Sequence, residues 1–429
     1  MAIADSLTAA HHGPARTSPP RTDGPPAAGS ANGADRAASS PPVRGGGPAV
    51  PASAVPSSAG VEPETRERLA ACAETAYRTG EPDREAVSVL RESRLLGAAV
   101  PREHGGAGAD AATLNTLVEQ VASANASAAI MLFQHYAVSA RIVEHGTPSQ
   151  CRDLLPRLAA GTWLAASAWS ETGAGADKKK LSTSARRTDG GGWVLEGAKS
   201  FTTSAGVADV YLVLAQTEVA ERDGEGDGDG DAAYGAAGQT FFLVPGDNPG
   251  LLPDTSMRLS GMRGSATGFV SLSGCHVPDE ARLGPQGAAA SIIAGVRESG
   301  ASLGAVAVGI ARAAVDSAHR HAERRGLLTH QAVRHRLVEM DAQVEAGRAI
   351  VERAGLRRAP DPGTTTLFSK LFASATAENV IAEVGRMLGS AGYVESHPLN
   401  RYSHDVRAVA LMGPTNDLCK ELVSLPWTR

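Results

Sequence analysis

The fold is decided by the stretch W-S-E-T-G-A-G-A-D, residues 169–177, together with K-S-F-T-T-S, residues 199–204. Both stretches combine small residues with hydroxyl groups. Glycine has no Cβ and lets main-chain N–H groups come close to phosphate or ring oxygens, and each hydroxyl can supply one directed hydrogen bond. Taken alone, a G-x-G before an acidic residue is typical of a surface turn. The pair of stretches predicts a place where the backbone approaches a planar ligand.

The two stretches resemble the flavin-binding pair of the acyl-CoA dehydrogenase family, which reads roughly T-E-P-G-A-G-S-D and K-x-W-I-T-N. The resemblance extends from about Val61 to the C-terminus. It implies an α+β fold of the acyl-CoA dehydrogenase type that binds FAD. The hydroxyl that faces the flavin ring in the family is retained at Thr203. The positions that depart from the family pattern are Ser170, Thr172, Ala176, Phe201 and Ser204.

A second group of matches lies in the C-terminal part of the chain. R-M-L-G-S-A-G-Y, residues 386–393, resembles the family's Q-I-L-G-G-x-G-Y, a glycine turn through which one subunit touches the cofactor diphosphate of its neighbour. Leu388-Gly389 alone is equally compatible with a helix stop. Arg386 adds a charge that suits a diphosphate. The resemblance therefore implies a homodimer or homotetramer. It implies cofactor contacts at Trp169, Ser170, Gly175, Phe201, Thr203, Arg324, Arg386, Gly389, Thr415 and Asp417.

The resemblance also locates the substrate. G-M-R-G-S-A-T, residues 261–267, matches the family's G-M-R-G-S-x-T turn, which borders the acyl thioester site, so Arg263 and Ser265 are expected to bind substrate. The family's catalytic glutamate lies in I-Y-E-G-T-S-E. The corresponding run here is L-M-G-P-T-N-D, residues 411–417, which places Gly413 at the glutamate position. Glycine cannot accept a proton, so removal of the substrate α-proton needs another carboxylate within hydrogen-bond reach.

Glu298 is the expected substitute for the missing base. It lies on the helix where some family members carry their base, one residue before the aligned Ser299. One residue corresponds to about 100° around a helix, so Glu298 could equally form a surface ion pair with Arg297. Asp417, Asp405 and His404 are further candidates, of which Asp417 occupies a flavin-contacting position in the family and Asp405 is expected to anchor an arginine.

Three functions fit these expectations. The first is α,β-dehydrogenation of an acyl thioester, on CoA or on a carrier protein, with an electron-transfer flavoprotein or oxygen as the electron acceptor. The second is a flavin monooxygenase on the same fold, in which His104, His135 or Tyr136 assists oxygen chemistry; each of these side chains could instead be hydrogen-bonded or exposed without a catalytic role. The third is a flavin-dependent lyase, or a catalytically silent relative that binds thioesters.

The domain organisation follows from composition and periodicity. Residues 1–60 are rich in Ala, Pro, Gly and Ser and are expected to be disordered. Helical periodicity fills 61–163, short β-type runs fill 164–280, and helical periodicity returns in 281–429. The resemblance implies an N-terminal helical domain, a middle β-barrel-like domain and a C-terminal four-helix bundle.

Length and composition indicate a large enzyme. The chain has 429 residues and a formal net charge of −5, which argues against nucleic acid as a partner. Its four cysteines are widely separated and show no metal-site spacing, so no metal is expected. No apolar run reaches the roughly 20 residues that span a bilayer. The expected location is the cytoplasm, without membrane attachment.

Overall fold

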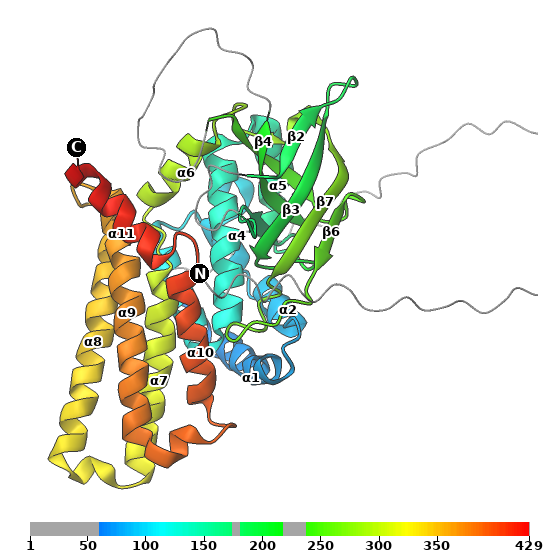
Figure 1. The fold of residues 1–429 in the computed structure, drawn as a ribbon. Coiled ribbons are helices and arrows are strands. Elements are labelled where there is room, and N and C mark those ends of the chain that lie inside the picture. The colour runs from blue at the N-terminus through cyan, green and yellow to red at the C-terminus, as the bar shows by residue number, and fades with distance from the viewer. Residues whose placement is uncertain (1–59, 174–180, 218–236, 429) are drawn as a thin grey trace, which may run out of the picture. The chain divides into compact units, whose positions relative to one another are not determined.

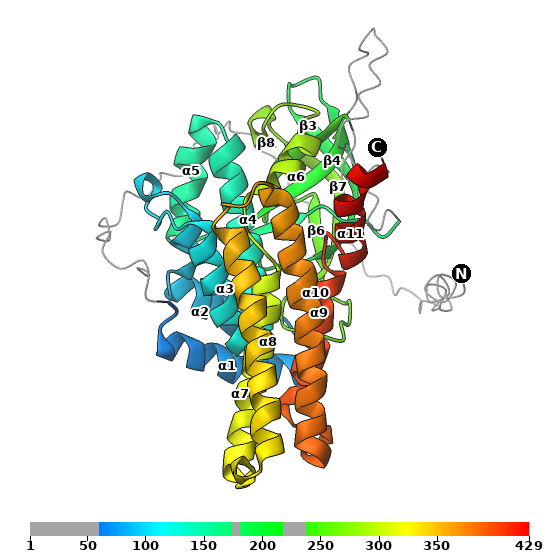
Figure 2. The same ribbon diagram turned by 90° about the vertical axis from the view of Figure 1, so that its left-hand side faces the viewer.

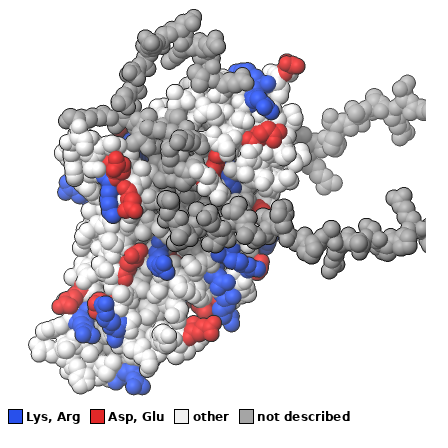
Figure 3. All heavy atoms as spheres, viewed as in Figure 1, with Lys and Arg blue, Asp and Glu red and all other residues white. Residues whose placement is uncertain are grey.

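The computed structural model describes residues 60–173, 181–217 and 237–428 (Figure 1). The expected disordered tail up to residue 59 and the expected cofactor contact Gly175 lie outside these ranges. Among the described residues, no helix is both long and apolar enough to cross a membrane. Basic and acidic side chains are interspersed over the face drawn in Figure 3.

The N-terminal part is helical, and polar caps set the starts of its helices. Asp83, Asp110 and Asn125 each accept a hydrogen bond from the main-chain N–H three residues further on, at 2.8–3.0 Å. Thr147 and Gln150 form a reciprocal capping box. The elements are α1 (Pro63–Thr79), α2 (Arg84–Glu92), η1 (Leu95–Ala99), η2 (Arg102–His104), α3 (Ala111–Ala124), α4 (Ala126–His145) and α5 (Pro148–Ala159).

The middle part is a curved sheet with the strand order β6-β7-β3-β2-β4-β5-β8, and β1 pairs with β4. Trp193 on β3 and Phe242 on β5 make an edge-to-face contact at 5.4 Å between ring centroids, although two strands separate them in the sheet. The sheet therefore curls around a common interior. The strands are β1 (Ala165–Ala168), β2 (Ser184–Arg187), β3 (Trp193–Thr202), β4 (Val210–Thr217), β5 (Gln239–Pro245), β6 (Leu251–Asp254), β7 (Gly268–Val277) and β8 (Arg282–Leu283).

Both faces of β4 are buried. Tyr211 and Val213 point into the interior of the curled sheet, whereas Leu212 and Leu214 pack against the helical side. Figure 2 shows α4, α5 and α6 on that side. This explains why β4 and β5 read as continuous apolar runs, because a strand buried on both faces has no polar alternation.

The C-terminal part packs long helices side by side. Helices α7, α8, α9 and α10 run along one another (Figure 1), and α7 also packs on α3. Gly309 on α7 makes that contact close, since a Cβ there would overlap the main chain of Glu119. The helices are α6 (Ala289–Glu298), α7 (Gly304–Arg324), η4 (Leu327–Thr329), α8 (Gln331–Gly355), α9 (Pro362–Leu388), η5 (Gly389–Tyr393), α10 (Pro398–Leu411), α11 (Asn416–Ser424) and η6 (Leu425–Thr428).

This arrangement is the expected α+β architecture with helices at both ends and a β part between them. The sheet extends past the expected boundary at residue 280, because β8 pairs with β5 through Phe241 and Phe242. Strands β2 and β6 have only four residues each and carry too little apolar alternation to be expected from the sequence.

Candidate active site

The three parts of the fold meet at the turn of residues 261–267. From the C-terminal helices, Asp405 accepts a hydrogen bond from the Met262 N–H at 2.6 Å. From the N-terminal helices, the Asp83 N–H donates to the Gly264 carbonyl at 2.9 Å. Within the β part, the Ser204 N–H donates to the Ser265 carbonyl at 3.0 Å. The expected substrate turn is therefore fixed from three directions.

Hydroxyl groups gather where this turn meets the end of β3. The Oγ atoms of Ser265 and Thr267 lie 2.8 Å apart, and Thr267 Oγ1 donates to Thr203 Oγ1 at 3.3 Å. Thr203 and Ser265 are both buried. The structure thus brings together residues from the expected flavin segment and the expected substrate turn.

Phe201 presents an aromatic surface beside these hydroxyls. Its side chain is 63% exposed, although its neighbours on both sides are buried. Its backbone has φ of 51°, in the left-handed region, and Ser204 follows with φ of 64°. Non-glycine residues rarely adopt this conformation, which is frequent at binding sites. An exposed ring held by a constrained backbone suits stacking against a planar group.

Several buried polar atoms near the 169–173 and 199–204 stretches lack a partner among the described residues. They are Trp169 Nε1, Ser200 Oγ, Thr202 Oγ1 and Ser204 Oγ. Buried polar groups normally find a hydrogen-bond partner, and unsatisfied ones need an explanation. A ligand with several ring nitrogens and carbonyl oxygens would satisfy such a set. The residues present therefore fit a flavin.

A buried ion pair supports this site and was not expected from the sequence. Lys199 Nζ lies 2.7 Å from Glu171 Oε1, and both side chains are almost fully buried. Ser182 and Thr183 donate three further hydrogen bonds to the Glu171 carboxylate. Burial favours a higher pKa for Glu171, but Lys199 and these donors outweigh it and lower the pKa to about 2. The pair ties the segment after β1 to β3. Two opposite charges inside the quoted stretches were the only sequence signal for it.

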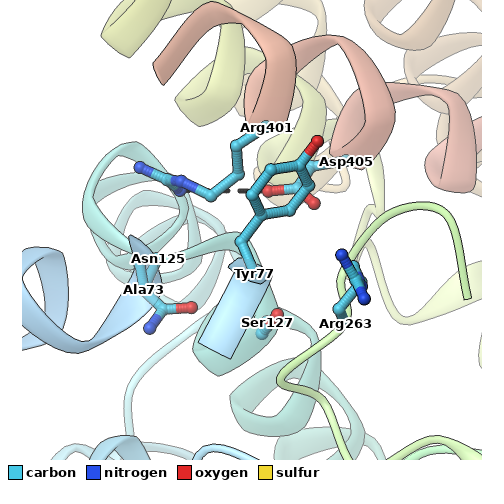
Figure 4. A pocket seen from close by; sticks show the side chains of 7 residues that line it. All are labelled: Ala73, Tyr77, Asn125, Ser127, Arg263, Arg401 and Asp405. Carbon is cyan, nitrogen blue, oxygen red and sulfur yellow. Dashed lines mark ion pairs between the residues drawn. The ribbon is translucent and has the colours of Figure 1, made fainter. Parts of the chain in front are cut away.

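Arg263 lies in a narrow polar pocket between α1, α10 and the 261–267 turn (Figure 4). Its guanidinium is 5.6 Å from the ring centroid of Tyr77, and Tyr77 Oη is 2.7 Å from His404 Nδ1. Asp405, at the back of the pocket, lies 3.9 Å from Arg401. Burial raises the pKa of Asp405 to about 6 despite this arginine. Asp405 therefore anchors an arginine and the turn, as expected, and His404 is engaged with Tyr77.

The loop that carries Gly413 is held by α9. Lys370 Nζ donates to the Met412 carbonyl at 2.8 Å and also to the Pro414 carbonyl. Gly413 itself is exposed. Thr415 caps α11 by accepting from the Leu418 N–H at 3.2 Å. Asp417 is exposed and pairs with Lys420 at 3.0 Å.

Glu298 is the last residue of α6 and is exposed. Within the part of the chain that the structure describes, it forms no ion pair with Arg297. It lies against the first turn of α9, close to Gly363. Gly363 precedes Lys370 by two helical turns, which is roughly 10 Å along α9. Glu298 and the 412–414 loop therefore flank the same end of α9.

Asn115 on α3 fixes the chain just after Glu298. Its side chain donates to the Gly300 carbonyl at 2.9 Å and accepts from the Ser302 N–H at 3.0 Å. Ser302 Oγ is 2.6 Å from Ser369 Oγ on α9. This buried network orders the break between α6 and α7, and no motif in the sequence predicts it.

Arg324, Arg386 and Gly389 lie elsewhere. They occupy the end of α7 and the end of α9, at the end of the bundle away from the sheet (Figures 1 and 2). Arg324 is exposed, and Arg386 is exposed and hydrogen-bonded to Glu383. Within one subunit, these arginines therefore lie apart from the hydroxyl cluster around Thr203.

His135 and Tyr136 of the N-terminal helices are hydrogen-bonded to main-chain groups. His135 is fully buried and accepts from the Ala165 N–H at 3.1 Å, while its Nε2 faces the Leu96 carbonyl at 3.1 Å. Burial lowers the pKa of His135 to about 4, so it is neutral at physiological pH. Tyr136 donates to the Leu95 carbonyl at 2.8 Å, and burial raises its pKa. His104 is half-buried in η2. His135 and Tyr136 join α4 to η1.

The chain matches three family descriptions in order: "Acyl-CoA dehydrogenase, N-terminal domain" over residues 60–162, "middle domain" over 166–275 and "C-terminal domain" over 290–424. It is 31% identical to cyclohexane-1-carbonyl-CoA dehydrogenase of Geobacter metallireducens, over 84% of this chain and 93% of that protein.

Two solved structures have a similar fold. Butyryl-CoA dehydrogenase from Megasphaera elsdenii superposes with a TM-score of 0.74 at 25% identity, covering 86% of this chain and 99% of that one. The protein FkbI, "for Biosynthesis of Methoxymalonyl Extender Unit of Fk520", superposes with a TM-score of 0.72 at 25% identity, covering 85% of this chain and 99% of that one.

Proposed function

Because the chain belongs to the acyl-CoA dehydrogenase family and is a flavin-dependent oxidoreductase of that type, we propose that it binds FAD and carries out α,β-dehydrogenation of an acyl thioester. The acyl group is carried by CoA or by a carrier protein. The names of the similar proteins differ in the acyl group, cyclohexane-1-carbonyl-CoA in one and a methoxymalonyl extender unit in the other, so the proposal is made for the thioester class.

One observation carries this proposal. The hydroxyls of Thr203, Ser265 and Thr267 form a chain of contacts that joins the flavin segment to the substrate turn. A hydride passes from the substrate β-carbon to a flavin only when both lie face to face within contact distance. The junction of these two segments supports such an arrangement, in which Phe201 and Trp169 Nε1, a buried donor without a partner among the described residues, would lie on the flavin side.

Each residue then has a definite task. Arg263 and Ser265 bind the thioester, and Thr203, Ser170 and Thr415 bind the flavin. When bound, the flavin supplies the acceptor for the hydride. The α-proton passes to the Glu298 carboxylate, because Gly413 offers no acceptor. The electron pair leaves through an electron-transfer flavoprotein or oxygen.

Anaerobic mixing of the holoenzyme with acyl-CoA thioesters tests this function through the loss of flavin absorbance. Glu298→Gln should slow bleaching about 100-fold or more, because general-base catalysis typically contributes factors of 10²–10⁴. Glu339→Gln is the matched control, since Glu339 is also an exposed glutamate on a helix, α8, and has no proposed task. Wild-type bleaching rates in Glu298→Gln would assign the proton to a different acceptor.

A monooxygenase is the second candidate, and two observations favour it. The base position is Gly413, and Glu298 is an exposed side chain rather than one desolvated in a cavity. Wild-type protein that bleaches with no thioester, yet hydroxylates a substrate when supplied with reduced flavin and oxygen, would replace the dehydrogenase proposal. Because His135 and Tyr136 are hydrogen-bonded to the main chain, they are poor candidates for assisting oxygen chemistry.

The flavin site is completed by a second subunit. Arg324 and Arg386 reach the diphosphate of a FAD bound to the partner of a homodimer or homotetramer. Their exposure and their distance from the Thr203 site within one chain support this arrangement. Sedimentation of the wild-type holoenzyme tests this arrangement. A monomer that retains FAD would contradict the proposed second subunit.

A further inference from the structure

We propose that Lys370 is a positioning residue that sets the conformation of the loop at residues 412–416, through which the C-terminal helices reach the flavin. Its ammonium donates to the carbonyls of Met412 and Pro414, on either side of Gly413. A single buried group on α9 therefore fixes the backbone where the family carries its base.

The loop is the principal partner of this ammonium. Lys370 is 3% exposed, and within the described residues it forms no ion pair with a carboxylate. A buried ammonium without a counter-ion is costly unless its protons are hydrogen-bonded. The two loop carbonyls supply this compensation. The interaction constrains both partners, because displacing the loop would leave the ammonium unsatisfied.

Two further contacts hold the same loop to α9 and α11. Asn416 Nδ2 donates to Ser374 Oγ, one helical turn beyond Lys370, at 2.9 Å. The Cys419 thiol, fully buried on α11, donates to the Pro414 carbonyl at 3.6 Å. Lys370 is the charged member of this set. These contacts hold the loop to α9 and α11, while Gly413 is exposed.

This geometry couples Lys370 to the reaction. The loop joins α10, whose Asp405 anchors the substrate turn, to α11, which begins after Thr415. Thr415 is a proposed flavin contact, so this step rests on the proposed function. Without Lys370 the loop would no longer be held at a fixed distance from the flavin. We therefore expect kcat to fall more than KM rises.

Hydrogen exchange and FAD titration of the full-length protein test the proposal. Lys370→Met should raise the exchange rate of amides in residues 411–417 by about tenfold or more, with little change in β3 and β4. The dissociation constant for FAD should rise about tenfold, because a displaced loop would lose the proposed hydrogen bond from Thr415 to the flavin. Lys370→Arg keeps the charge and the donors, so it should recover most of both losses. Lys420→Met, on the exposed face of α11, is the matched control.

Separate readouts distinguish failure of this inference from failure of the proposed function. Wild-type protein that does not take up FAD would refute the proposed function, whereas the exchange measurement would still test the loop. Unchanged exchange in 411–417 would overturn the role of Lys370.

If Lys370→Met does not fold, Lys370→Gln, which keeps a hydrogen-bond donor, is measured in the same way. On substrates that bleach the flavin, kcat should fall more than KM rises; equal effects on the Lys420 control would overturn the proposal.

Discussion

Removal of the Lys199 ammonium is the perturbation with the clearest expected magnitude. Lys199→Met would leave the Glu171 carboxylate buried, with only the Ser182 and Thr183 donors. Breaking a buried pair by deleting one partner typically costs about 3–5 kcal/mol. The pKa of Glu171 is lowered to about 2, whereas burial lowers the pKa of Lys199 to about 8, so the two shifts oppose each other and the expected loss follows from the carboxylate left buried without its partner. We therefore expect the free energy of unfolding to fall by about 3 kcal/mol at pH 7.

The stability difference between wild type and Lys199→Met should depend on pH in a direction set by the Glu171 pKa. The pKa of Glu171 is lower in the folded state than in the unfolded state, so its contribution to stability is present above pH 4.5 and lost as the pH falls through 2. The difference in stability between wild type and Lys199→Met should therefore shrink as the pH is lowered below 4.5. Urea unfolding at pH 7 and pH 4, followed by tryptophan fluorescence, to which the buried Trp193 contributes, measures this difference.

Two variants complete the test. Adding Glu171→Gln to Lys199→Met removes the unpaired charge and should restore most of the lost stability. Lys420→Met breaks an exposed pair with Asp417 and should change the free energy of unfolding by less than about 0.5 kcal/mol. The reasoning would be refuted if Lys199→Met were as stable as wild type, or if the double variant were no more stable than Lys199→Met.

Three other outcomes are expected. The combined change Thr203→Val and Ser170→Ala should weaken FAD retention, since each lost hydrogen bond is worth roughly 0.5–1.5 kcal/mol; the flavin absorbance that stays with the protein after gel filtration checks it. Arg386→Ala should lower FAD affinity by about 1.5–3 kcal/mol with unchanged circular dichroism, as a charge-assisted contact predicts. Asp405 has a pKa raised from 3.8 to about 6, so it contributes stability below pH 3.8 that is lost as the pH rises through 6; Asp405→Asn should remove that part of the pH dependence of the melting temperature.

Much of the architecture could be predicted because local patterns and tertiary packing agree. The apolar runs of β4 and β5 are buried on both faces, and the periodic helices α7, α8 and α9 end close to the glycines seen in the sequence. The stretches at 199–204 and 261–267 lie against each other, with Thr267 between Thr203 and Ser265. Short motifs can predict such features because all the residues of one motif lie within a few positions of the same turn.

The rest depended on contacts between distant segments. Lys370 lies 42 and 44 positions before its partners Met412 and Pro414 in the sequence, and no motif links them. Asn115 holds Gly300 across 185 positions. His135 reads as a candidate for chemistry, yet both of its ring nitrogens face main-chain groups. Side-chain partnerships of this kind appear only when the chain is folded.

The anchoring of the 412–414 loop through carbonyls has an evolutionary consequence. Lys370 donates hydrogen bonds to main-chain oxygens, which every amino acid provides. These hydrogen bonds therefore do not depend on which residue occupies position 413. The scaffold can therefore tolerate substitution at this exposed position while the loop keeps its path. A lineage could lose or regain an acidic group there by a single replacement and explore new chemistry without rebuilding the surrounding helices.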